Sequence, residues 1–402
     1  MSEVSSLSPE DVKSIVHDYA SKLREYRRYL HQNPELSFKE TNTAKWVREH
    51  LKELNIPTVE GIRGNSTVGI LKGETEGPTL LFRADIDALP ITEESGVEFA
   101  SKNEGVMHAC GHDAHTATLM CFADFLSHHR DLIHGTVKFV FQQGEDCIPG
   151  GGKFIVEDGV LDDVDQVFAW HCAPEAEVGK VIAAGGPRTA SFSNFEIEVK
   201  GKGGHGGFPF KSIDPISTGA LVVTAINQLM GWTVDPLESA TLIVSRFEAG
   251  QHDRFNIIPD TAVIEGNIRT HNNQVAEELC KKVQLTAEKI CEAKGCQCDF
   301  KLLKGYPALI NDAKITDHIR KTLVEYGIDA VVTKPIMGAE DFAFYTQVKP
   351  GTYFNVGTRN PEDENTFFPP HNSHFTIDEK AMENALATLL VSYQEASNGR
   401  TM

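Results

Sequence analysis

The residues best suited to chemistry form a dense cluster, His108-Ala-Cys110-Gly-His112-Asp113-Ala-His115. A soft thiolate and several imidazoles within a few residues are typical of a loop that binds a transition metal. A helix expected to begin near the end of this cluster would anchor the loop. The alternative is a chance cluster at a helix start, in which Asp113 caps the helix.

Two adjacent carboxylates, Glu145 and Asp146, follow the apolar run 139–141. Sheets of the α/β type place active residues just beyond the ends of their strands. In a loop, one acid can bind a metal while the other acts as a base toward water. The alternative is a solvent-exposed acidic turn before the glycines at 150–152.

Further histidines follow a strand or precede a helix. His171 comes after the expected strand 166–169, a position that suits a metal ligand and a buried core histidine equally well. His371 and His374 lie in a loop before the last expected helix. Either could be a ligand, and the residues alone do not choose between them.

Two groups in the middle of the chain are suited to bind a substrate. His205 lies in the glycine-rich run 201–209, where backbone can approach a ligand closely, although such a run also suits a wide turn. Asn267 and Arg269 lie at the end of an expected strand, and a guanidinium is suited to grip a carboxylate. The alternative for Arg269 is a surface arginine.

The composition excludes several classes of protein. A length of 402 residues predicts two domains. The 38 Lys and Arg against 57 Asp and Glu give a net charge of −19, which disfavours nucleic acid and anionic membranes as partners. No apolar run is long enough to span a membrane, and the N-terminal residues lack the features of a signal peptide. We therefore expect a cytoplasmic protein.

The 8 cysteines are too few for a disulfide framework and suit a reducing compartment. Cys291, Cys296 and Cys298 lack the paired C-x-x-C spacing of a zinc site. We interpret these three as small apolar residues.

Strands and helices alternate through the first 186 residues, which predicts an α/β layer with a mainly parallel sheet. Ser8 and Pro9 mark the start of a helix that continues to Leu30. The other elements expected here are helices at 43–54 and from about 115, and strands at 66–72, 79–83, 136–142 and 166–169.

Between residues 187 and 304 the expected order becomes strand, helix, strand, strand, helix, strand, which is the ferredoxin-like signature. These elements span 194–200, 215–229, 241–249, 262–270, 273–293 and 297–303. The α/β pattern then resumes with a helix at 315–326, a strand at 352–356 and a helix at 378–393. We predict a catalytic domain of residues 1–186 and 305–402, with a ferredoxin-like domain of residues 187–304 inserted into it.

Seven segments spread over nearly the whole chain match motifs of one known family in the same order. They are Arg27–Phe38, Phe82–Pro90, His108–Asp113, Gly201–Pro209, Asn256–Asp260, Gly338–Tyr345 and the loop that begins at His371. Through them the chain resembles the aminoacylase and carboxypeptidase superfamily of dinuclear metallohydrolases. The branch it resembles contains hippurate hydrolases, plant indole-acetyl-amino-acid hydrolases and bacterial N-acyl-amino-acid amidohydrolases.

The resemblance implies a fold and a set of site residues. The fold is a zinc-peptidase-like α/β/α catalytic domain with an inserted ferredoxin-like α+β domain, which serves as a lid and in dimerisation. The implied metal ligands are Cys110, His112, Asp146, His171 and His371. The resemblance thus favours His371 over His374 as the last ligand. Glu145 is implied as general base and Asp85 as an acidic group near the metals. His205 would reach the substrate, often across a dimer, and Asn267 and Arg269 would hold its carboxylate.

The resemblance also implies an activity, which is hydrolysis of small N-acyl-amino acids by a homodimer or higher homo-oligomer. Two divalent ions per subunit, Mn or Zn with Co or Ni tolerated, would polarise the amide carbonyl and activate water. Glu145 would take a proton from that water and deliver it to the departing amine. The alternatives are a dipeptidase or carboxypeptidase on the same fold and, in a different class, a metal-binding sensor whose chemistry has decayed.

One position departs from the family's pattern. The family usually has Gln-Pro-Ala-Glu-Glu, whereas this chain has Gln142-Gln-Gly-Glu-Asp146. Because Asp is one methylene shorter than Glu, its carboxylate reaches less far. We therefore expect the ion that Asp146 serves to bind weakly.

Overall fold

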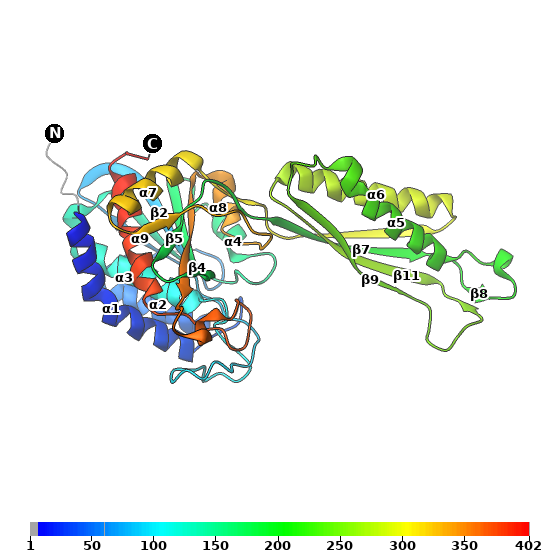
Figure 1. Ribbon diagram of the computed structural model, residues 1–402, viewed down its shortest axis with the longest axis horizontal. Helices are drawn as coiled ribbons and strands as arrows, with labels where there is room; N and C mark the ends of the chain where they lie inside the picture. Colours follow the sequence, from blue (N-terminus) through cyan, green and yellow to red (C-terminus); the bar gives the residue numbers. More distant parts are fainter. Residues whose placement is uncertain (1–6, 60, 402) are drawn as a thin grey trace. The chain divides into compact units, whose positions relative to one another are not determined.

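The computed structural model describes residues 7–59 and 61–401, and the chain divides into two compact units. The first unit comprises Met1–Arg188, Ile310–Lys334 and Asp341–Met402, and the second comprises Thr189–Leu309 and Pro335–Glu340. The first is an α/β unit and the second is an α+β unit inserted into it, so the fold class expected from the sequence is confirmed (Figure 1).

Within the described residues, seven strands of the first unit form one sheet in the order β1-β3-β2-β4-β15-β5-β14. The strands are β1 (Thr67–Lys72), β2 (Thr75–Asp85), β3 (His134–Gln142), β4 (Gln166–Glu177), β5 (Lys180–Ile182), β14 (Asp329–Val331) and β15 (Gly351–Arg359). The pairs β3–β2, β2–β4, β4–β15 and β5–β14 are parallel, and β1–β3 and β15–β5 are antiparallel. The sheet is therefore mainly parallel, as expected.

Helices pack on this sheet. They are α1 (Pro9–Gln32), α2 (Thr41–Glu53), α3 (His112–His128), α4 (Gly151–Glu157), α7 (Ala313–Glu325), α8 (Ala343–Val348) and α9 (Ala381–Ser397). Helices α3 and α9 contact the sheet and each other, and α1 contacts both of them. Their packing encloses a core that includes the fully buried rings of Phe82, Phe122 and Phe139. Helices α4 and α8 contact each other and lie on the opposite side of the sheet (Figure 1).

The strand register brings the ends of β2, β3 and β4 to one edge of the sheet. Asp85, the last residue of β2, pairs with Gln142, the last residue of β3. Arg83 of β2 pairs with Ala169 of β4, so the next residues on the same face of each strand are Asp85 and His171. The residues that follow β2, β3 and β4 therefore lie close together at this edge of the sheet.

Local sequence explains how two helices begin. At α1, Ser8 and Asp11 form a capping box, with each side chain accepting a hydrogen bond from the other's backbone N–H, as the sequence indicates. At α3 the N-cap is Gly111, in the left-handed region at φ 89°, where a Cβ would meet the sulfur of Cys172 at 2.6 Å. The alternative in which Asp113 caps this helix is therefore wrong.

The second unit contains the expected ferredoxin-like order. Its elements are β7 (Ser191–Lys200), α5 (Pro215–Thr233), β9 (Ala240–Ala249), β11 (Thr261–Thr270), α6 (Asn273–Ala293) and β12 (Gln297–Lys304). The four strands form an antiparallel sheet in the order β12-β7-β11-β9, with α5 and α6 packed against it. Cys291 and Cys296 are buried in the core of this unit, which agrees with their interpretation as small apolar residues.

Several short elements complete the chain. Two-stranded sheets pair β8 with β10 and β6 with β13. These strands and the 3-10 helices are β6 (Gly186–Thr189), β8 (Gly204–His205), β10 (Ile257–Ile258), β13 (Leu309–Asn311), η1 (Arg130–Leu132), η2 (Pro209–Lys211) and η3 (Glu364–Phe367). In the part of the chain that the structure describes, no helix has the length and apolar character that a membrane crossing requires.

The second unit reaches beyond the expected boundary at residue 304, to Leu309, and also takes in Pro335–Glu340. Gly305 donates a backbone hydrogen bond of 3.0 Å to Phe192, which holds the chain after β12 against β7. In the segment 335–340, the Gly338 carbonyl accepts a hydrogen bond of 2.8 Å from the Ala190 amide. Such long-range hydrogen bonds leave no periodic pattern in the sequence.

Candidate metal centre

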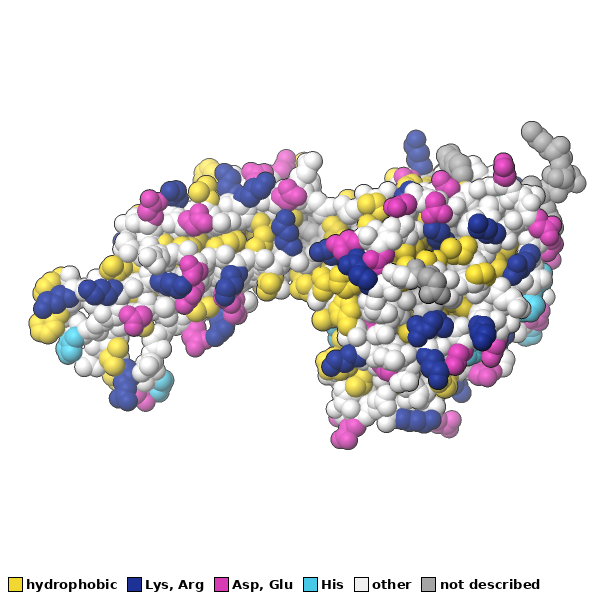
Figure 2. All heavy atoms as spheres, turned by 180° about the vertical axis from the view of Figure 1, so that it is seen from behind, with side chains coloured by type: hydrophobic (Ala, Val, Ile, Leu, Met, Phe, Trp, Pro, Cys, Tyr) yellow, Lys and Arg dark blue, Asp and Glu magenta, His cyan; other side chains and the backbone are white. Residues whose placement is uncertain are grey.

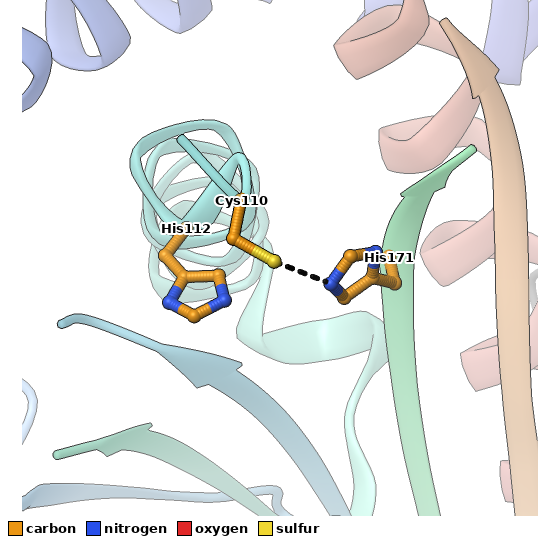
Figure 3. Close-up of side chains that lie close together, drawn as sticks. All are labelled: Cys110, His112 and His171. Carbon is orange, nitrogen blue, oxygen red and sulfur yellow. Dashed lines mark hydrogen bonds between the residues drawn. The ribbon is translucent and has the colours of Figure 1, made fainter. Parts of the chain in front are cut away.

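Three of the expected metal ligands meet between the start of α3 and strand β4. Cys110 and His112 come from the loop and first turn of α3, and His171 comes from β4 (Figure 3). The sulfur of Cys110 lies 3.4 Å from Nε2 of His171. One possible ligand atom from each of the three residues lies within 4.8 Å of the others, which is the spacing of donors around one ion.

Asp146 and His371 form a second group of this kind with Cys110. Nε2 of His371 lies 3.4 Å from Oδ1 of Asp146. His374 points elsewhere, with its Nδ1 only 2.6 Å from the backbone oxygen of Glu94. The structure therefore brings His371, and not His374, to Cys110 and Asp146.

Neighbouring groups orient these donors. Nδ1 of His112 lies 2.9 Å from the backbone oxygen of Asp87 and 3.1 Å from its Oδ1, and Nδ1 of His171 lies 2.8 Å from the carbonyl oxygen of Cys172. A proton on each Nδ1 leaves Nε2 as the donor atom. Nε2 of His112 and Oδ2 of Asp146 are buried, and within the described chain neither makes a hydrogen bond. A bound cation would satisfy both.

The electrostatics favour the thiolate form of Cys110. Burial and the nearby Asp146 would raise the pKa of this thiol. The imidazoles of His171 and His112 outweigh them, and the pKa is lowered to about 6. Because metals bind the thiolate form of cysteine, this shift would suit Cys110 to hold a metal at neutral pH.

Glu145 lies beside these donors without belonging to either group. Its side chain is nearly buried, with Oε2 at 3.9 Å from Nε2 of His112. Oε1 accepts a hydrogen bond of 3.3 Å from the backbone N–H of Asp341. A carboxylate fixed at this distance from the donors is placed to exchange a proton with a reacting group among them.

Asp85 and Asp87 both lie close to the centre but have different partners. Asp85 accepts from the guanidinium of Arg83 at 2.6 Å and is paired with His115, also at 2.6 Å. Asp87 bonds His112 and, through Oδ2, accepts from the backbone N–H of Asp146 at 3.1 Å. Sequence reasoning missed Asp87. The sequence feature that could have indicated Asp87 is its spacing of two residues from Asp85. In an extended segment this spacing places both side chains on the same face of the strand.

Of the two remaining histidines of the first cluster, His115 is hydrogen-bonded within the protein. Nε2 of His115 accepts a hydrogen bond of 3.0 Å from the amide of Cys172, so its Nδ1–H donates to Asp85. His108 is also buried, and burial lowers the pKa of both imidazoles to about 4. Both rings are therefore neutral. For His115, hydrogen bonding at both nitrogens leaves no lone pair for a metal.

The expected substrate-binding residues all belong to the second unit. Asn267 and Arg269 lie on β11 and touch each other, because Nε of Arg269 donates to Oδ1 of Asn267 at 3.1 Å. The guanidinium also donates to the carbonyl of Met337 at 2.6 Å. His205 is exposed on the β8–β10 ribbon, where its Nδ1 accepts from the amide of Gly207 at 3.0 Å.

Comparison with known proteins gives consistent matches over most of the chain. Residues 81–393 match the sequence model of the Peptidase family M20/M25/M40. Over 387 residues the chain is 38% identical to Thermostable carboxypeptidase 2 of Saccharolobus solfataricus, covering 95% of this chain and 98% of that protein. Over 305 residues it is 39% identical to the N-acyl-L-amino acid amidohydrolase of Geobacillus stearothermophilus, covering 76% and 82%. The solved structure of a dinuclear metal binding peptidase of the M20 family from Bacillus subtilis matches with a TM-score of 0.82 at 32% identity, covering 95% of this chain and 99% of that one.

Proposed function

Because the chain belongs to the Peptidase family M20/M25/M40, we propose that it hydrolyses the amide bond of N-acyl-amino acids. The products are a carboxylic acid and a free amino acid. The observation that carries this proposal is the meeting of Cys110, His112, Asp146, His171 and His371 beside the carboxylate of Glu145. The similarity to a relative named N-acyl-L-amino acid amidohydrolase supports the class of bond and substrate.

The donors fit two divalent cations. Cys110 is shared by the two donor groups. Nε2 of His112 and Oδ2 of Asp146 lie 4.0 Å apart, and neither makes a hydrogen bond within the described residues. A mixed set of thiolate, imidazole and carboxylate suits Mn, Zn, Co or Ni, with the thiolate favouring Zn. When bound, such ions supply Lewis acidity toward the amide carbonyl and toward the attacking water.

Glu145 carries the proton in this reaction. Its carboxylate takes a proton from water as the water oxygen attacks the amide carbon. It then delivers the proton to the amine nitrogen as the C–N bond breaks. The hydrogen bond from the Asp341 amide fixes Oε1, so Oε2 faces the donor cluster. Asp87 holds His112 and the backbone of Asp146 in place around it.

The second unit supplies substrate-binding groups in this proposal. Arg269, held by Asn267 and the Met337 carbonyl, presents a guanidinium that can pair with the free carboxylate of the amino-acid part. Arg269 is half-buried, and pairing of this kind discriminates against substrates that lack the carboxylate. His205 is exposed and can donate a hydrogen bond to a developing oxyanion.

The same unit is the proposed interface of a homodimer. Strand β9 is an edge strand, and Ile243 on it is 52% exposed. Helix α5, which packs beside β9, exposes Leu221 and Trp232. Figure 2 shows hydrophobic side chains on the surface of this unit. Exposed apolar residues along a free sheet edge are typical of an association surface.

A peptidase is the second candidate, because one relative with 38% identity is named Thermostable carboxypeptidase 2. It would use the same centre and the same proton transfer, and would differ in the acyl group it accepts. A decayed metal-binding sensor is disfavoured because Glu145 is retained beside the donors.

The deciding experiment is turnover of a substrate panel after loading with Mn²⁺ or Zn²⁺. The panel contains N-acetyl-amino acids, hippurate, an indole-acetyl-amino acid and unblocked dipeptides. We expect hydrolysis of the N-acyl-amino acids, and we expect Glu145→Gln to lower the rate about 10²–10⁴-fold with metal content unchanged. Preference for the dipeptides would establish the peptidase instead. Metal binding without hydrolysis of any substrate would establish the sensor.

A further inference from the structure

The segment between α1 and α2 contains two carboxylates, Glu35 and Glu40, that accept hydrogen bonds from backbone amides. Glu35 binds the start of α2. Its Oε2 accepts a hydrogen bond from the amide of Thr43 at 2.8 Å, and its Oε1 accepts one from the amide of Asn42 at 3.1 Å. It therefore caps the first turn of α2 from outside the helix.

Glu40 occupies the N-cap position of α2 but makes no capping hydrogen bond. Its Oε1 instead accepts from the backbone N–H of Gly144 at 2.8 Å and from that of Phe38 at 2.8 Å, and its Oε2 accepts from Nδ2 of Asn65 at 3.2 Å. The residue is fully buried. Burying a carboxyl group is costly unless it is hydrogen-bonded, and here one of its bonds goes to the residue before Glu145.

The turn at Gly144 packs tightly against Phe38. Gly144 lies in the left-handed region at φ 57°, and a Cβ there would meet the ring of Phe38 at 2.6 Å. Phe38 itself has φ 64°, which is uncommon for a residue with a side chain. A single oxygen of Glu40 bonds both amides and so links the Gly144 turn to the strained backbone of Phe38.

The residue before this turn is held separately. The amide of Gln143 donates to Oγ of Ser66 at 3.1 Å, and its Oε1 accepts from the amide of Asn65 at 2.6 Å. With Gln143 fixed to this segment, Gly144 is held on both sides, because its N–H donates to Glu40 and its carbonyl accepts a hydrogen bond of 3.0 Å from the amide of Gly151. Of these two bonds, the one to Glu40 is the one made by a side chain.

We propose that Glu40 is a positioning residue that holds the Gly144 turn and thereby aims the carboxylate of Glu145 at the reacting water. This role rests on the proposed function, in which Glu145 transfers the proton. The hydrogen bonds of the Glu40 carboxylate go to the amides of Phe38 and Gly144 and to Nδ2 of Asn65, and none of these is a proposed metal ligand or substrate-binding group. Its loss should therefore weaken proton transfer and leave binding intact.

The test compares Glu40→Ala with Glu35→Ala, a matched control that removes an amide-binding carboxylate from the same segment without touching the Gly144 turn. For Glu40→Ala we expect kcat to fall about 10²-fold, the loss that a misplacement of about 1 Å can cause, with KM and metal stoichiometry near wild type. Glu35→Ala should lower the melting temperature and keep kcat. Glu40→Gln should restore most of kcat, because its amide oxygen can accept the same two hydrogen bonds.

A double-variant cycle shows whether Glu40 acts through Glu145. In a Glu145→Gln background, Glu40→Ala should cause almost no further loss of kcat, because no base remains to be aimed. Should Glu40→Ala not fold, Glu40→Asp replaces it in the cycle, since the shorter side chain cannot reach both amides.

Three results would each overturn the inference. They are losses of kcat that add independently in the cycle, equal losses of kcat in the Glu35→Ala and Glu40→Ala variants, and wild-type kcat in a folded Glu40→Ala protein. These outcomes differ from failure of the proposed function, in which the wild-type protein itself would not hydrolyse the N-acyl-amino acids.

Discussion

The carboxylate of Asp146 has one buried oxygen that makes no hydrogen bond to the part of the chain that the structure describes, and its other oxygen lies 3.4 Å from Nε2 of His371. We predict that Asp146→Ala removes one ion per chain and most of the activity, because a carboxylate ligand also balances the metal's charge. Asp146→Glu should bind that ion more tightly, since its longer side chain reaches further. Metal analysis after dialysis and turnover with added divalent ion would check both variants.

Retention of two tightly bound ions and normal turnover by Asp146→Ala would show that another carboxylate completes the site. Asp113 and Asp85 are poor replacements, because Asp113 is paired with His31 at 2.7 Å and Asp85 is held by Arg83 and His115. Asp87 would be the residue to test next, since its Oδ1 already lies 3.1 Å from the His112 ring.

The two C-terminal histidines provide a second prediction at this scale. His371→Ala should lower metal stoichiometry and activity together, because its ring lies in the donor group with Cys110 and Asp146. His374→Ala should change both much less, since its ring bonds Glu94. The two variants are measured side by side, and an equal or greater metal loss in His374→Ala would reverse the assignment.

At the scale of elements, helix α1 is joined to the first turn of α3 by a buried ion pair. Nδ1 of His31 lies 2.7 Å from Oδ2 of Asp113, and its Nε2 lies 3.0 Å from Oε1 of Glu93. Burial alone would lower the pKa of His31, but Asp113 and Glu93 outweigh burial and raise it. The folded protein therefore binds this proton more tightly than the unfolded chain does.

We predict a pH-dependent penalty for His31→Gln. Because the folded pKa is raised, the contribution of His31 to stability is complete below about pH 6.5, the ordinary histidine value, and is lost as pH rises through the folded pKa. Breaking a buried pair costs about 3–5 kcal/mol. The difference in melting temperature between wild type and His31→Gln should thus be larger at pH 6 than at pH 9.

The control is His17→Gln, on the exposed side of the same helix. Its melting temperature should follow that of wild type across the pH range. A penalty for His31→Gln that stays constant or grows with pH would mean that the imidazole is neutral in the folded protein.

The elements that the sequence predicted well have strong local signals. Helix α6 spans Asn273–Ala293 as expected, because Asn272 caps its first turn and a clear apolar face follows. Strands β5 and β14 were missed because each has only three residues, too few to show a periodic pattern.

At the site, sequence motifs indicated the proposed metal ligands. The hydrogen bonds of Asp87 and Glu40 could not be predicted, because they join segments that are distant in the sequence.

At the scale of the whole molecule, we predict that association depends on the surface formed by α5 and the edge strand β9. Leu221→Glu on α5 should convert the proposed dimer into monomers, because it places a charge in an apolar contact. Leu285→Glu on α6 is the matched control, since the two leucines are 44% and 50% exposed but lie on different helices. Light scattering gives the mass of each variant. Dimers in both variants, or monomers in both, would exclude this surface.

The insertion of one unit into the other also sets an order of events during synthesis. Strand β15 pairs with β4 and β5, and α9 packs on α3 and β2, yet the ribosome makes both only after the whole ferredoxin-like unit. That unit can fold while translation continues, whereas the first unit waits with the largely apolar strand β4 unpaired on one side. Nascent chains that end before Gly351 are therefore the form of this protein most exposed to aggregation and most in need of a holding chaperone.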